Sequence, residues 1–115
     1  MSANFYCWMP ELELNPDDQS FGERIDRLYE QPKPQPAAAM LAFVADILAR
    51  YPDLTETDDT VWADGPMVNN ILGQFINMSV IWSRIKEAEQ VLAETAKRHG
   101  LYCYDPQSKK LLYRP

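Results

Sequence analysis

The order of hydrophobic patterns along the chain predicts a single α+β domain. We expect a mostly antiparallel sheet in a split βαβ (ferredoxin-like) arrangement, with the helices packed on one face. Short apolar and aromatic runs alternate with longer amphipathic segments, in the order β, α, α, β, β, α, β, β. A chain of 115 residues is long enough to bury one core, so residues 1–115 are expected to fold as one domain.

The first half of the chain contains one predicted strand and two predicted helices. Residues 4–9 form an aromatic strand that ends before a proline, and both of its faces are apolar, which favours a central position in the sheet. The acidic turn at 15–18 predicts a helix start, and the apolar stripe that follows is Phe21, Ile25, Leu28 and Tyr29. The alternating prolines of 31–36 predict an extended linker, and residues 36–50 predict a second helix with Pro36 in its first turn.

The second half predicts a hairpin, a helix and two short strands. Residues 67–72 and 74–82 alternate around a glycine and predict the hairpin. A helix follows from an N-capping Ser83 to about residue 98, with a glycine stop at Gly100. Strands at 101–104 and 111–113 complete the pattern.

The helix between the strands at 74–82 and 101–104 is a crossover connection. These two strands should therefore run in parallel, with the first strand lying between them. That arrangement makes Cys7 and Cys103 neighbours in the sheet. Two cysteines exclude a disulfide scaffold and a four-cysteine zinc site, and their apolar surroundings predict buried, reduced thiols.

The most unusual segment is an acidic loop at residues 52–66, which carries five carboxylates and neither lysine, arginine nor histidine. Three interpretations stay open: a solvated loop, an acidic surface that binds a protein, or a metal or paired-carboxylate catalytic site. In the protein-binding interpretation, Trp62 is either an aromatic anchor for the partner or a side chain that holds the loop on the core. The candidate partner-binding residues are Glu56, Asp58, Asp59, Trp62 and Asp64.

Composition excludes several classes of function. A formal net charge of −6 argues against binding to nucleic acid, which needs a basic surface. The sequence has no apolar run of the ~18 residues that a membrane span requires, and its first residues lack the features of a signal peptide, so we expect a cytoplasmic protein. The single histidine, His99, lies at a predicted helix end, and no catalytic, metal-binding or cofactor-binding motif is recognisable. We therefore assign no catalytic residue, metal or cofactor.

Three blocks of the sequence carry a resemblance: WADGP at 62–66, WS at 82–83 and HGLYCYDPQ at 99–107. With this spacing they resemble a family of small acidic bacterial proteins, along nearly the whole chain. Small acidic proteins of this kind resemble the immunity proteins of polymorphic toxin systems, such as those beside Rhs, contact-dependent and type VI secretion effectors.

This resemblance implies a function without turnover. The protein would bind a cognate toxin domain, such as an ADP-ribosyltransferase or a nuclease, and occlude its active cleft. Acidic residues suit that role because toxins acting on nucleic acids or NAD often have basic clefts. The alternatives are a small metal-dependent enzyme that uses the acidic loop, and an adaptor or regulatory domain that binds a housekeeping protein.

Overall fold

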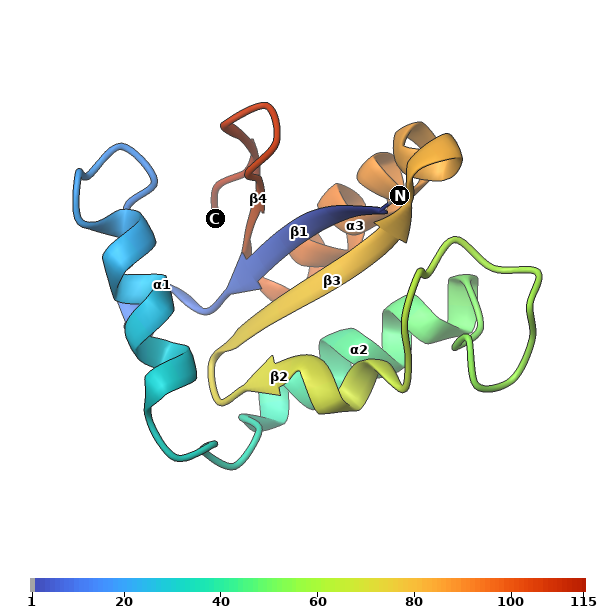
Figure 1. The fold of residues 1–115 in the computed structure, drawn as a ribbon, viewed down its shortest axis with the longest axis horizontal. Coiled ribbons are helices and arrows are strands. Elements are labelled where there is room, and N and C mark those ends of the chain that lie inside the picture. Colours follow the sequence, from blue (N-terminus) through green and yellow to red (C-terminus); the bar gives the residue numbers. More distant parts are fainter. Residues whose placement is uncertain (1) are drawn as a thin grey trace.

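One antiparallel sheet forms the centre of the computed structural model, which describes residues 2–115 (Figure 1). Met1 of the predicted domain lies outside the described residues. The strands are β1 (Ser2–Trp8), β2 (Ile71–Leu72), β3 (Phe75–Ile81), β4 (Tyr102–Asp105) and β5 (Lys110–Tyr113). The helices are α1 (Phe21–Glu30), α2 (Ala38–Arg50) and α3 (Ile85–His99), with 3-10 turns η1 (Pro10–Leu12), η2 (Met67–Asn70) and η3 (Trp82–Arg84). Within residues 2–115 no helix is both long and apolar enough to cross a bilayer.

The strand order is β2-β3-β1-β4-β5, so β1 lies between β3 and β4. Because β1 is antiparallel to both neighbours, β3 and β4 run in the same direction, and α3 connects them. The predicted crossover and the central position of the first strand are therefore confirmed. The α+β class is confirmed as well.

The prediction that all helices pack on one face of the sheet is wrong. Alternate residues of β1 point to opposite faces, and both faces are covered. On one face Phe5 and Cys7 join a core with α2 and α3. On the other face Trp8 packs in a second cluster with Ile25 of α1. Both faces of β1 carry apolar side chains, and α1 buries those on the face opposite α2 and α3.

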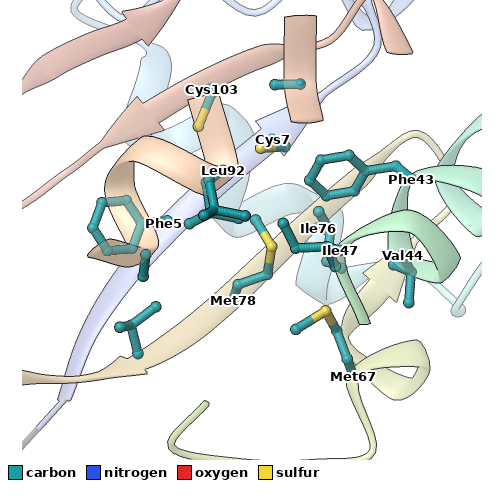
Figure 2. Close-up of a cluster of buried hydrophobic side chains, with 14 of the residues drawn as sticks. Phe5, Cys7, Phe43, Val44, Ile47, Met67, Ile76, Met78, Leu92 and Cys103 are labelled. Carbon is teal, nitrogen blue, oxygen red and sulfur yellow. The ribbon is translucent and has the colours of Figure 1, made fainter. Parts of the chain in front are cut away.

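The larger core is drawn in Figure 2, where side chains from the sheet meet those of α2 and α3. Its central members are fully buried, and close packing of such side chains is the main stabilising contribution in a domain of this size. They include Phe5 and Cys7 of β1, Ile76 and Met78 of β3, Phe43 and Ile47 of α2, and Leu92 of α3.

Cys7 and Cys103 are directly opposite each other on β1 and β4, and both thiols are free and buried. Burial raises the pKa of the Cys7 thiol well above its ordinary value, and the hydrogen bond with Cys103 raises it further. A thiol held in its neutral form is a poor nucleophile. The prediction of neighbouring, buried thiols is confirmed.

Several element boundaries differ from the predictions. Most of the expected strand at 67–72 is the turn η2, and only Ile71–Leu72 pairs with β3, because asparagines 69 and 70 favour a turn over a strand. The core-facing alternation of β3 ends at Val80, since the chain turns into η3 and leaves Trp82 52% exposed. Ser83 lies inside η3 and does not cap α3. Pro36 precedes α2, whose first residue is Ala38.

Candidate functional site

The acidic loop at 52–66 is fixed at its base by hydrogen bonds. In Figure 1 it is the green segment that follows α2 and projects at the end of the molecule opposite α1. The hydroxyl of Thr60 donates to the carbonyl oxygen of Pro52 (2.6 Å) and closes the loop. The side chain of Asp53 points inward, where its Oδ2 accepts the backbone N–H of Met67 (2.9 Å). A Cβ at Gly65 would clash with the Asp53 carboxylate, so this close approach requires glycine.

Trp62, a predicted binding residue, lies in the core with 1% of its surface exposed. Its indole N–H donates to the carbonyl oxygen of Tyr51 (2.8 Å), which ties the loop to the end of α2. The structure therefore places Trp62 as the side chain that holds the loop on the core, the second of the two roles considered for it. A buried indole offers no contact surface to a partner, so the exposed candidates are the carboxylates.

The end of the loop runs along the sheet. The backbone N–H of Ala63 donates to the carbonyl oxygen of Ser79 on β3 (2.9 Å). The backbone N–H of Ile81 donates to the carbonyl oxygen of Val61 (2.8 Å). Trp62 forms an isolated antiparallel bridge with Val80. The same edge of β3 pairs with β2 at Phe75 and Ile76, so residues 61–63 extend the sheet beyond β2.

The four predicted carboxylates Glu56, Asp58, Asp59 and Asp64 are all exposed. The backbone N–H of Glu56 donates to the carbonyl oxygen of Asp53 (2.9 Å), which closes a turn near the start of the loop. Asp64 lies past Trp62, where both of its oxygens accept from the side-chain amide of Asn70 at 3.4 Å. The structure brings all four onto one ordered loop while leaving them in contact with solvent.

A cationic group that the sequence analysis did not single out lies beside this loop. Arg84 of η3 approaches Asp59 at 3.6 Å, but the Asp59 side chain is 97% exposed, so this ion pair contributes little. Arg84 donates more closely to Glu87 (2.6 Å), which also accepts from the hydroxyl of Tyr51. These two hydrogen bonds lower the pKa of Glu87, the one from Arg84 more strongly. Arg84 is thus mainly a partner of Glu87, and the spacing of three residues at the start of a predicted helix is the sequence signal for that contact.

The loop carboxylates do not converge on a point. Among residues 2–115, no three histidine, cysteine, aspartate or glutamate side chains are placed to share a metal ion. Asp53, which the sequence grouped with the other acids, is 9% exposed and accepts the backbone N–H groups of Thr55 in the loop and of Met67 in η2. The metal-dependent interpretation of the loop therefore gains no support from the geometry.

His99 ends α3, as predicted, and its contacts are local. Its Nε2 lies 2.9 Å from Oδ2 of Asp46 on α2, and Arg98 contacts the same carboxylate at 3.1 Å. The hydrogen bond with His99, followed by that with Arg98, lowers the pKa of Asp46. This group joins α2 to α3.

Comparisons of the chain with protein-family models, with curated proteins and with solved structures find no match. The resemblance to small acidic immunity-like proteins therefore stays a prediction from the sequence.

Proposed function

We propose that this chain is a cytoplasmic immunity protein that binds a cognate toxin domain and occludes its active cleft. Binding alone would neutralise the toxin, so the protein needs no catalytic residue of its own. The proposal requires a surface that is complementary to a basic cleft and already ordered before the partner arrives.

The acidic loop at 52–66 is the observation that carries this proposal. Its carboxylates are exposed, while Trp62 and Asp53 fix the loop on the core by hydrogen bonds of 2.8 and 2.9 Å. Charges of one sign on a fixed surface accelerate encounter with an oppositely charged partner. An ordered loop also loses little conformational entropy on binding, which favours affinity.

The charge of the whole chain supports the same type of partner. With 17 acidic and 11 basic residues, the protein as a whole attracts a basic protein and repels nucleic acid. A toxin domain that acts on nucleic acid or NAD needs cationic groups to hold its phosphate-bearing substrate. The loop can occupy such a cleft by presenting carboxylates where the substrate phosphates would lie.

Co-expression with the toxin-like domain encoded beside this protein tests the proposal. We expect the cells to survive and the two proteins to purify as a stable one-to-one complex. Survival without a complex would contradict inhibition by binding and indicate enzymatic reversal of the damage. Cell death, or a growth defect on deleting this protein in cells without any toxin, would instead support the adaptor alternative.

We further propose that the fold is a variant of the split βαβ class. The strand order β2-β3-β1-β4 and the helix between β3 and β4 support this assignment. Two features depart from that class: a pair of helices connects β1 to β2, and α1 covers the opposite face of the sheet. β5 adds a further strand at one edge.

A further inference from the structure

An open hollow lies at the base of the acidic loop, where the loop runs beside the end of β3. Its volume is about 440 Å³. Three segments distant in sequence meet there: the start of β1, the two ends of the loop and the last residue of β3. We call it the Ile81 hollow; it is lined by Ser2, Leu54, Trp62, Ala63 and Ile81.

The hollow exists because α1 covers only part of its face of the sheet. Side chains alternate along a strand, so Ser2 and Ile81, which pair with each other, point away from the core that contains their neighbours Ala3 and Val80. The cluster that packs against α1 lies at the other end of β1, around Trp8. In Figure 1, α1 is at one end of the sheet, and the end of β3 and the acidic loop are at the other. Helix α1 therefore leaves this end of the face open.

The hollow gathers apolar side chains that the protein itself covers incompletely. Leu54 and Ile81 are partly buried, and Ala63 is exposed. Single apolar residues are common on protein surfaces, but several that share one hollow are typical of an interaction site. Trp82, which follows Ile81 in the chain, is 52% exposed, and tryptophan is enriched among the residues that dominate protein interfaces.

The surroundings of the hollow indicate a protein partner and not a small molecule. Small-molecule sites add several convergent polar groups to an apolar lining. Among the described lining residues, Ser2 supplies one hydroxyl, and the indole N–H of Trp62 is already bonded to Tyr51. Charges lie beside the lining instead, because the exposed Asp64 and Glu56 are one and two residues beyond the lining residues of the loop. An apolar centre with a charged, solvent-exposed rim is the usual arrangement of a protein interface.

We propose that the Ile81 hollow receives one apolar side chain of the protein partner, at a point where basic residues flank that side chain. The apolar lining accommodates the inserted group, and the carboxylates of the loop select the charge of its neighbours. Arg84, the cation beside the loop, is paired with Glu87, so the loop keeps its negative charge.

This inference rests on the proposed function, and it adds an anchor to it. Exposed charges mainly accelerate the encounter of two proteins, whereas contacts that exclude water mainly slow their dissociation. The acidic loop and the Ile81 hollow therefore have separate tasks in one interface.

A titration of the ¹⁵N-labelled protein with a short peptide, in which one leucine lies between lysines, tests the proposal. We expect saturable shifts of the backbone amide signals of Leu54, Ala63 and Ile81. The matched peptide with serine in place of leucine has the same charge and should produce no saturable shift of these signals. Equal binding of the serine peptide would overturn the proposal, because charge alone would then explain binding. Absence of saturable shifts with the leucine peptide would overturn it as well.

Two variants reduce the apolar lining without changing the charge. Ile81→Thr keeps a β-branched residue at the end of β3, and Leu54→Ser changes the loop side of the hollow. Each should weaken binding of the leucine peptide by about fivefold or more, the loss that marks an important interface residue. Leu41→Ser is the matched control, because Leu41 lies on α2 outside the hollow and is 44% exposed. It should leave the affinity unchanged, and a loss equal to that of Ile81→Thr would contradict the proposal.

A third variant tests the hollow without removing any apolar group. Ala63 is exposed, so Ala63→Gln can place a longer side chain in the hollow while the core stays intact. This variant should also weaken binding of the leucine peptide, and thermal melts establish that each variant is folded. Undiminished binding by a folded Ala63→Gln variant would contradict insertion at this place.

The two proposals can fail separately in the toxin complex. Ile81→Thr should raise the dissociation rate of the complex and leave its association rate unchanged. If the complex forms and protects cells, but Ile81→Thr dissociates at the original rate, the hollow proposal is wrong and the immunity role stands. If the leucine peptide binds the hollow but no toxin domain binds the protein, the immunity role is wrong and the hollow remains a binding site.

Discussion

At the scale of single residues, buried polar groups fix the acidic loop. Asp53 looks like another member of the acidic run in the sequence, yet its carboxylate is nearly buried and accepts the N–H of Met67. Trp62 is likewise turned inward and bonded to Tyr51. Residue type and spacing cannot distinguish these inward side chains from outward ones in a loop without regular periodicity. The sequence therefore indicated the correct segment but not which of its side chains are exposed.

Replacing Asp53 should destabilise the loop more than replacing any of the exposed acids. Asp53→Ala leaves the N–H of Met67 without an acceptor, and an unpaired buried donor costs about 1–3 kcal/mol. The free energy of unfolding from urea denaturation measures this, and exchange of the Met67 amide should accelerate. Asp58→Ala, on the exposed side of the same loop, should change stability by less than ~0.5 kcal/mol. Equal effects of the two variants would show that Asp53 does not anchor the loop.

Asp46 should contribute to the decline of stability in acid. Hydrogen bonds from His99 and Arg98 lower its pKa in the folded protein from the ordinary value of 3.8. As the pH falls, Asp46 therefore becomes protonated in the unfolded chain at a higher pH than in the folded protein. Its contribution to stability is complete above the ordinary pKa and is lost as the pH falls through the lowered pKa of the folded protein. Asp46→Asn should flatten the fall in unfolding free energy below about pH 4. If the unfolding free energies of Asp46→Asn and the original protein decrease in parallel as the pH falls, Asp46 makes no such contribution.

At the scale of elements, the sequence predicted one end of α3 correctly and the other end wrongly. The C-terminus of α3 is as expected, because Gly100 adopts a left-handed conformation with a φ of 67° and Leu101 donates back to Ala96. The N-terminus of α3 differs from the prediction, because the turn η3 occupies the place where Ser83 was expected to cap the helix. A glycine stop depends on local backbone conformation alone, whereas a capping serine also requires the preceding strand to end at the right residue.

Two glycine substitutions should have opposite effects on stability. Gly100→Ala forces a side chain into the left-handed region and should cost about 1 kcal/mol. Gly22→Ala, in the first turn of α1 and with open space around its Cβ position, should stabilise by up to about 1 kcal/mol through helix propensity. Thermal melts of both variants measure this. Destabilisation of similar size in both would contradict the assigned backbone conformations.

At the scale of the whole molecule, the sheet order followed from the sequence and the placement of α1 did not. The crossover rule makes β3 and β4 parallel once α3 is recognised, and the split βαβ pattern places β1 between them. The rule does not say which face of the sheet a helix covers. Two apolar faces on β1 were visible in the sequence, and they are the signal for α1, because Trp8 and Tyr6 need a helix that packs against them.

The acidic loop could be predicted from the sequence, because its five carboxylates lie close together within residues 52–66. Its position beside β3 could not be predicted, because only the folded chain brings Val61 and Ala63 against Ile81 and Ser79.

The association rate with the toxin domain of the proposed complex, measured against ionic strength, tests the central claim most directly. Glu56→Gln, Asp58→Asn, Asp59→Asn and Asp64→Asn are combined in one variant, and a control variant carries Glu11→Gln, Glu13→Gln, Asp17→Asn and Glu94→Gln, four exposed acids outside the loop. Both variants have the same net charge. We predict slower association and a flatter salt dependence for the loop variant, with the control close to the original protein. Equal rates for the two variants at every salt concentration would contradict the claim that this loop meets the partner.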